Sequence, residues 1–127
     1  MIIGIIADPL SHPDWPQIEA FLDPSAKYGG TEILPEGHAL WAVYDGLQLV
    51  GCATARLTVD DFGEVVLVGG RNAAKWIKAL DTQIGNWMRD EGMTAVRAYG
   101  RNGWTRLLKD WRVMGRKDKF TGYERQL

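Results

Sequence analysis

Val65-Val66-Leu67-Val68-Gly69-Gly70-Arg71-Asn72-Ala73-Ala74-Lys75-Trp76 is the stretch that decides the fold. Its first four residues are apolar and mostly β-branched, which predicts a buried strand. Two glycines and an arginine follow, and apolar residues then recur at helical spacing from Ile77 to Met88. Glycines at a helix start let an anion approach unpaired backbone N–H groups. The junction is therefore either an anion site or an ordinary strand-to-helix connection, with Asn72 as the expected cap of the long helix.

A three-strand meander is predicted before this junction. Residues 39–44 and 47–57 read as two strands joined at Asp45-Gly46, and residues 64–68 form the third strand after a turn. Asp-Gly between apolar runs favours a tight hairpin because both central residues of that turn take positive φ. At the amino end, residues 2–7 predict a first strand. A helix then starts at Ser11 or His12 and ends or restarts at Asp23-Pro24.

The long helix is expected to stop at Gly92, after which residues 94–99 predict another strand. Asn102 is the expected cap of a further helix, and a hairpin closes the chain around a basic turn at residues 116–119. The apolar stripe of the helix expected after Asn102 comprises Trp104, Leu107, Leu108 and Trp111. The step from strand 64–68 through the long helix to strand 94–99 is a βαβ unit, which places the two strands parallel. The prediction is an α+β fold with a mixed sheet and helices on both faces.

Composition indicates one domain spanning residues 1–127, with 46% hydrophobic and 24% charged residues. The net charge of −1 argues against a strongly basic nucleic-acid binder. Cys52 is the only cysteine, so an internal disulfide and a cysteine-based zinc site are excluded, and no metal is expected. No apolar run approaches the ~20 residues of a membrane helix. The start of the chain predicts a strand rather than a signal peptide, and the expected location is the cytoplasm.

Three segments together resemble the GNAT acetyltransferase fold, and the resemblance covers nearly the whole chain. They are the hairpin at residues 40–53, the strand–loop–helix at residues 65–90, and the strand end and helix at residues 98–109. The third segment looks most like small GNAT-like proteins of phages and prophages. That likeness adds a virion-associated location as an alternative.

The resemblance implies acetyl-CoA as the cofactor. By position, Leu67, Val68 and Gly69 would face the pantetheine arm. The diphosphate would lie against Gly70, Arg71, Asn72, Ala73 and Ala74, and Asn102 is the further residue implied in cofactor binding. A strand N–H near Val66 or Leu67 would polarise the thioester carbonyl.

The chain departs from the family pattern at three positions. Ala74 stands where the family loop has its first glycine, and Trp76 stands at its second small residue. The indole therefore either occupies the diphosphate position or points into the core. Leu108 aligns with the tyrosine that often acts as general acid in the family, and Leu108 has no proton to give. Tyr99 lies nearby but is not that residue.

Glu64 is the predicted general base, because the family often uses a carboxylate at the start of this central strand. His38 is a second candidate, since an imidazole titrates near neutrality. Asp60 and Asp61 are adjacent turn residues, for which a structural role is favoured.

Two functions follow from the resemblance. One is an N-acyltransferase that moves an acetyl group from acetyl-CoA to a primary amine on a small molecule or peptide. The other is a non-catalytic GNAT-fold module of a phage or prophage, for interaction or within a virion. Nucleic-acid binding through the basic carboxy-terminal third is the weakest alternative, because its tryptophans fit a buried stripe. Pairing of edge strands would allow a homodimer.

Overall fold

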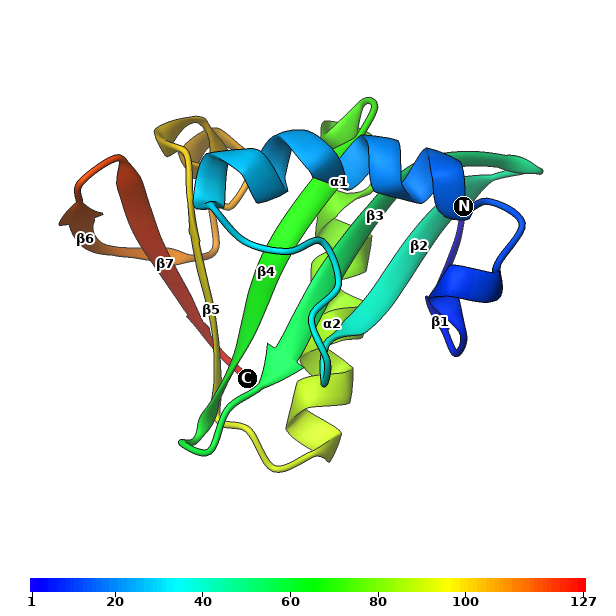
Figure 1. Ribbon diagram of the computed structural model, residues 1–127. Helices are drawn as coiled ribbons and strands as arrows, with labels where there is room; N and C mark the ends of the chain where they lie inside the picture. Colours follow the sequence, from blue (N-terminus) through cyan, green and yellow to red (C-terminus); the bar gives the residue numbers. More distant parts are fainter.

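The computed structural model describes residues 1–127 and contains one seven-stranded sheet, ordered β1-β2-β3-β4-β5-β7-β6 (Figure 1). The strands are β1 (Ile2–Ile6), β2 (Ala39–Asp45), β3 (Gln48–Leu57), β4 (Phe62–Gly70), β5 (Ala95–Gly100), β6 (Arg112–Lys117) and β7 (Phe120–Gln126). Two α-helices, α1 (Trp15–Gly29) and α2 (Ile77–Asp90), accompany three short 3₁₀ helices, η1 (Pro9–Ser11), η2 (Ala73–Lys75) and η3 (Asn102–Arg106).

The sheet is mixed, as predicted. Strands β1 to β4 pair antiparallel in sequence order, β4 pairs parallel with β5, and β5, β7 and β6 pair antiparallel. The predicted βαβ unit is therefore confirmed, with α2 as its crossover helix. The Asp45-Gly46 hairpin is confirmed as well, with Gly46 at a φ of 62°.

The two helices cover opposite faces of the sheet, which confirms the predicted fold class (Figure 1). Helix α1 buries Ile18 and Leu22 completely against β2, β3 and β4. Helix α2 buries Leu80, Ile84 and Met88 on the other face. Full burial of such a side chain contributes about 1.5–3 kcal/mol each, so both faces of the sheet have a core of their own.

Helix α1 differs from the prediction at both ends. It runs through Pro24 to Gly29 and does not end at Asp23-Pro24. The lost backbone bond at Pro24 is offset because Ala26, in the turn beyond it, is buried in the α1-side core. The cap is Asp14 rather than Ser11 or His12, and it makes no capping bond because its carboxylate accepts the Tyr44 hydroxyl at 2.6 Å.

Helix α2 starts at Ile77, so the prediction of Asn72 as its cap was wrong. Asn72 takes a left-handed conformation with φ 53° and makes no side-chain capping bond. Its segment is bent back toward β3, where the Arg71 N–H donates to the Val50 carbonyl at 2.8 Å. The predicted stop at Gly92 is confirmed, with φ 90°.

The helix predicted after Asn102 is also wrong in type, since only the short 3₁₀ helix η3 forms there. Gly103 lowers the helix propensity of this segment. The apolar side chains of the expected stripe still pack against the core on the side of α2, where Trp111 is buried. Trp104, Leu108 and Trp111 also line a cleft described below.

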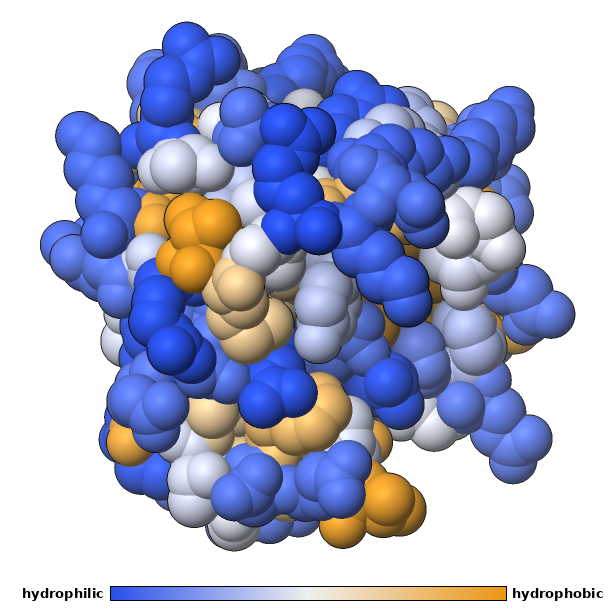
Figure 2. Space-filling model, turned by 90° about the vertical axis from the view of Figure 1, so that its left-hand side faces the viewer, coloured by the Kyte–Doolittle hydropathy of each residue, from blue (hydrophilic) through white to orange (hydrophobic).

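The terminal hairpin β6–β7 is confirmed, and β6 forms an exposed edge of the sheet. The side of the molecule nearest this hairpin is mostly hydrophilic with scattered hydrophobic residues (Figure 2). Val113 and Met114 are the exposed apolar residues of β6. Neither helix of the fold has the length and apolar character required to cross a lipid bilayer.

Candidate active-site cleft

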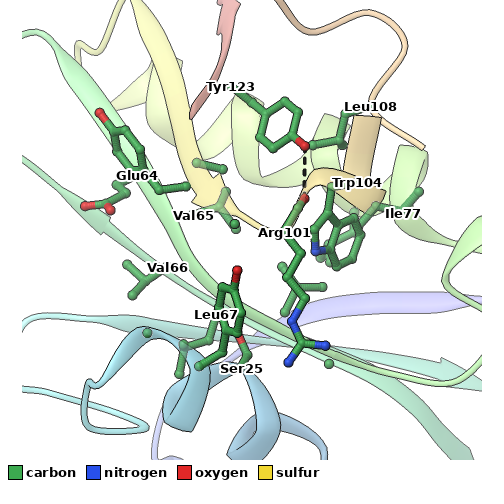
Figure 3. Close-up of a pocket in the computed structure, with 18 of the residues that line it drawn as sticks. Ser25, Glu64, Val65, Val66, Leu67, Ile77, Arg101, Trp104, Leu108 and Tyr123 are labelled. Carbon is green, nitrogen blue, oxygen red and sulfur yellow. Dashed lines mark hydrogen bonds between the residues drawn. The ribbon is translucent and has the colours of Figure 1, made fainter. Parts of the chain in front are cut away.

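A cleft opens where β4 and β5 stop pairing. Their parallel ladder runs from the pair Phe62–Ala95 to the pair Val65–Ala98 and then ends, although β4 continues to Gly70 and β5 to Gly100. The diverging strands enclose a volume of about 530 Å³, lined mainly by hydrophobic residues (Figure 3). Beyond Val65, the β5-facing edge of β4 therefore has no strand partner, and its backbone polar groups are free to bind a ligand.

A β-bulge in β4 lies at the narrow end of this opening. The register places Leu67 opposite Thr54 and Val65 opposite Ala55, so Val66 has no Cα partner on β3. The Leu67 N–H donates to the Thr54 hydroxyl at 3.2 Å. Of the two N–H groups predicted to polarise a thioester carbonyl, that of Leu67 is therefore engaged, and that of Val66 is the better candidate.

Trp76 points into the core and not toward the cofactor loop. Its side chain is 1% exposed, and its ring lies against Gly51. The indole N–H donates to the Arg71 carbonyl at 2.8 Å and so holds the loop from Arg71 to Lys75 in place. Of the two orientations considered from the sequence, the structure has the one that leaves the loop's outer face open.

The structure separates the predicted cofactor residues into two groups. Leu67, Val68, Gly69 and Gly70 line the cleft. Arg71, Asn72, Ala73 and Ala74 lie just beyond its rim at the end of β4, where the Asn72 N–H donates to no backbone carbonyl. Asn102 is exposed at the start of η3 and does not line the cleft. The Arg71 guanidinium lies 5.6 Å from the ring centroid of Phe21 and has no carboxylate partner.

Glu64 lines the cleft and is held by Arg56. The Nε and a terminal nitrogen of Arg56 both lie 2.7 Å from Oε1 of Glu64, and the Glu64 side chain is 17% exposed. Both contacts use the same carboxylate oxygen. The other oxygen, Oε2, has no bonding partner in the protein and is available to accept a proton.

The other candidate bases lie elsewhere. His38 does not line the cleft, and its Nδ1 is buried without a hydrogen-bond partner. Desolvation, followed by the charge of Arg56, lowers the pKa of His38 below its usual value of 6.5. Asp60 and Asp61 are exposed turn residues, and the Asp61 carbonyl accepts the Thr94 N–H at 2.7 Å.

Several cleft residues were missed by the sequence analysis. Tyr123 of β7 lies beside Leu108 on the wall opposite Val66 (Figure 3). Its hydroxyl donates to the Arg101 carbonyl at 3.0 Å and lies 3.0 Å from the Thr105 hydroxyl. Tyr99, which the sequence placed near the site, lines the cleft and is 45% exposed. Only the register of β7 against β5 reveals that Tyr123 faces this space, and the sequence has no signal for that register.

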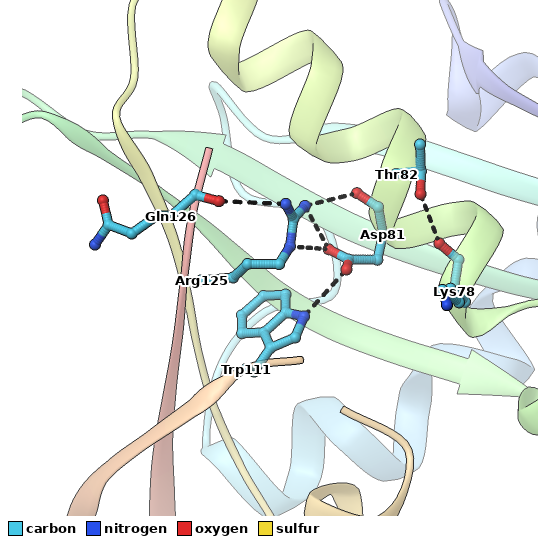
Figure 4. A network of polar contacts seen from close by, with 6 residues as sticks. All are labelled: Lys78, Asp81, Thr82, Trp111, Arg125 and Gln126. Atoms are coloured by element: carbon cyan, nitrogen blue, oxygen red, sulfur yellow. Dashed lines mark hydrogen bonds and ion pairs between the residues drawn. The ribbon is translucent and has the colours of Figure 1, made fainter. Parts of the chain in front are cut away.

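Asp81 joins the far side of the cleft to the end of the chain. Its carboxylate accepts bonds from Arg125, the closest at 3.0 Å, and from the Trp111 indole N–H at 3.1 Å (Figure 4). The Arg125 guanidinium also donates to the Asp81 backbone carbonyl at 3.3 Å. This network fastens β7 and the segment before β6 to α2, which fixes the wall formed by Trp104, Leu108 and Trp111.

The sequence matches no protein-family model, and no curated protein matches it. Solved structures do share its fold. Tetrahymena GCN5 superposes with a TM-score of 0.78 at 11% identity, covering 99% of this chain and 96% of that one. PaiA N-acetyltransferase from Thermoplasma acidophilum, solved with coenzyme A, has a TM-score of 0.72 at 17% identity and covers both chains completely. A GNAT family acetyltransferase from Elizabethkingia anophelis, solved with acetyl-CoA, has a TM-score of 0.74 at 10% identity, covering 99% and 97%. The chain therefore has the GNAT acetyltransferase fold over its whole length.

Proposed function

We propose that this chain is an acyl-CoA-dependent N-acyltransferase that acetylates a primary amine, with residues 1–127 acting as one domain. The observation that carries the proposal is the cleft between β4 and β5, because an unpaired strand edge can hold the amide groups of a pantetheine arm. The similar structures solved with coenzyme A and acetyl-CoA support the same ligand here. The inward orientation of Trp76 supports it further, since the indole leaves the loop accessible.

The chain offers one residue set for each part of acetyl-CoA. Leu67, Val68 and Gly69 would hold the pantetheine arm, and the diphosphate would lie against the segment from Gly70 to Ala74. Backbone N–H groups near a helix start favour an anion, and the Arg71 guanidinium adds charge-assisted hydrogen bonds. Asn102 is exposed and lies outside the cleft, so it would contact only a part of the cofactor that extends beyond the cleft.

The chemistry asked of the protein is small. The thioester supplies an activated acyl group, so positioning the amine and removing its proton are the main requirements. Glu64 would accept that proton at Oε2, directly or through a water, while Arg56 holds the carboxylate in place. The amine nitrogen would bond to the acyl carbon as the carbon–sulfur bond breaks, and the departing thiolate would take a proton from solvent, since Leu108 has none to give. The Val66 N–H stabilises negative charge on the carbonyl oxygen.

A non-catalytic binding module is the second candidate. It is favoured by Leu108, which lines the cleft at the position of the family's proton donor, and by Ala74 in the cofactor loop. The phage or prophage likeness, the cytoplasmic or virion-associated location and the homodimer stay predictions from the sequence.

Calorimetric titration with acetyl-CoA tests the cofactor. Arg71→Ala is expected to weaken binding by about tenfold, which is the loss of one charge-assisted contact. The matched control is Arg89→Ala, because Arg89 is also exposed but lies in the last turn of α2, away from the loop. If the unmodified protein binds no acetyl-CoA at millimolar concentration, the acyltransferase proposal is wrong.

Thiol release in the presence of amines then separates the enzyme from the binding module. Glu64→Gln is expected to reduce turnover by about a hundredfold or more, the usual contribution of a general base, with acetyl-CoA affinity unchanged. Glu91→Gln, an exposed substitution at the end of α2, is the control. Binding without any turnover over a broad amine panel would support the non-catalytic module.

A further inference from the structure

The cleft is lined from both faces of the sheet. On the side of α1 its lining includes the exposed residues Pro24 and Arg101, and this part is called the α1-side opening below. Phe21, Pro24, Ser25 and Tyr28 of α1 line it, as do Leu80, Asp81 and Ile84 of α2 on the other face. A contact between distant segments borders the α1-side opening. The Tyr28 hydroxyl donates to the Lys119 carbonyl at 2.6 Å, and the Tyr28 and Phe120 rings meet edge to face at 5.4 Å. The end of α1 is thereby joined to the β6–β7 turn.

Two cations face the same aromatic ring at this opening. The guanidinium of Arg101 lies 4.5 Å from the ring centroid of Tyr28, and the ammonium of Lys119 lies 4.6 Å from it. Neither side chain takes part in any of the ion pairs of the structure. The ring attracts each cation, but the two like charges repel each other without a counter-ion between them.

Both carboxylates that line the cleft already have a cationic partner of their own. Glu64 is paired with Arg56, and Asp81 is paired with Arg125 and bonded to Trp111. These two are the only acidic residues that line the cleft. The α1-side opening therefore presents uncompensated positive charge, which attracts anions and repels cationic ligands.

We propose that the acceptor amine carries a carboxylate or phosphate group that binds to Arg101 and Lys119 beside the Tyr28 ring. This inference rests on the proposed acyltransferase function. The Arg71 guanidinium of the diphosphate loop lies over Phe21, whereas Arg101 and Lys119 lie at Tyr28, nearer the end of α1. The two cations are therefore separate from the loop proposed for the donor. The Arg101 side chain extends through the pocket toward α1, where Ser25 adds a hydroxyl (Figure 3). The expected substrates are amino acids and amino phosphates, and simple diamines are disfavoured.

Matched pairs of amines test this substrate class. Lysine is compared with cadaverine, which lacks its carboxylate, and phosphoethanolamine with ethanolamine. The anionic member of each pair is expected to have a kcat/KM about tenfold higher or more, and Arg101→Gln or Lys119→Gln should remove that preference through KM. Arg106→Gln and Lys109→Gln are the controls, because both residues are exposed cations that do not lie over the Tyr28 ring.

An anion titration without acetyl-CoA keeps this inference separate from the proposed function. Inorganic phosphate, compared with chloride at equal ionic strength, is expected to shift the backbone amide resonances of Arg101 and Lys119, and Arg101→Gln should abolish those shifts. The proposal is overturned if phosphate causes no shift, or if neutral amines are acetylated as well as their anionic partners. It is also overturned if Arg101→Gln weakens acetyl-CoA binding as much as Arg71→Ala, because the cations would then serve the donor. Loss of acetyl-CoA binding in the unmodified protein, with phosphate shifts intact, would reject the acyltransferase alone.

Discussion

Replacing Trp76 by phenylalanine should destabilise the protein more than the same replacement at Trp41. Both tryptophans are buried, at 1% and 6% exposure, and both belong to the α2-side core. They differ in one respect. The Trp76 indole N–H donates to the Arg71 carbonyl at 2.8 Å, whereas the Trp41 indole N–H is buried without a partner. The pair of variants therefore isolates the hydrogen bond from the loss of ring volume.

The expected difference follows from the contacts. Each change removes similar packing, which costs about 1 kcal/mol or somewhat more. Trp76→Phe also loses a hydrogen bond worth ~1 kcal/mol, whereas Trp41→Phe removes an unsatisfied donor and recovers ~1 kcal/mol or more of desolvation. The free energies of unfolding of the two variants should thus differ by about 2 kcal/mol. For a urea slope of ~2 kcal/mol per M, their midpoints should lie about 1 M apart.

Urea unfolding followed by far-ultraviolet circular dichroism measures this difference without relying on tryptophan fluorescence. Acetyl-CoA titration of the same proteins gives a second readout. Trp76→Phe should also weaken binding, because the Arg71 carbonyl loses its tether, whereas Trp41→Phe should not. Equal midpoints, or a less stable Trp41→Phe, would refute the reasoning from hydrogen bonding.

Three further predictions concern a charge, a thiol and a backbone contact. A hydrogen bond from Arg97, and to a smaller extent one from Arg112, holds the pKa of Glu124 below its ordinary 4.5. This carboxylate therefore stabilises the fold above that pH, and its contribution is lost as the pH falls below it. The difference between the melting temperatures at about pH 6 and about pH 3 should therefore be smaller for Glu124→Gln than for the unmodified protein. An unchanged difference would contradict this role of Glu124. Burial raises the pKa of Cys52 to about 12, so the native protein should not react with a thiol reagent at about pH 8, and prompt labelling before unfolding would be inconsistent with this core. Gly69→Ala should lower the unfolding free energy by about 1–3 kcal/mol, because the added Cβ would overlap the α1 backbone. Gly4→Ala is the control and should be nearly neutral, because its Cβ would meet no atom within 4 Å. Similar losses at both positions would contradict the close approach of α1 to Gly69.

The elements that the sequence predicted well are those whose signal is local. The Asp45-Gly46 hairpin depends on two residues that tolerate positive φ, and the stop at Gly92 depends on one. The βαβ unit follows from hydrophobic periodicity alone. The extension of α1 to Gly29 could not be predicted in this way, because it depends on tertiary contacts of Ala26 and Tyr28 that outweigh the local signal of Pro24.

The residues of the candidate site also divide into those that a local sequence signal predicted and those that tertiary contacts position. Leu67 to Gly70 line the cleft and belong to a strand that its apolar pattern predicted, whereas their part in cofactor binding stays a prediction. Asn102 lies outside the cleft, at the start of a 3₁₀ helix where an α-helix was expected, and its part in cofactor binding also stays a prediction. Arg101 and Tyr123 were not singled out as cleft residues, because strand register and the meeting of distant segments decide their positions.

The separation of β4 and β5 is itself an argument that a ligand binds in the cleft. Parallel strands that run side by side gain hydrogen bonds by pairing along their whole length, yet β4 and β5 separate after Val65 while both continue. The bulge at Val66 and the separation leave backbone groups without partners, which lowers stability unless a ligand or water satisfies them. A chain selected only for stability would close this gap, whereas here the Asp81 network and the Tyr28–Lys119 contact hold the elements around the cleft in position. For the question of ligand binding, the missing loop glycines therefore count for less than the presence of the cleft. An arginine can replace backbone contacts to a phosphate, but nothing in a closed sheet could replace the cleft.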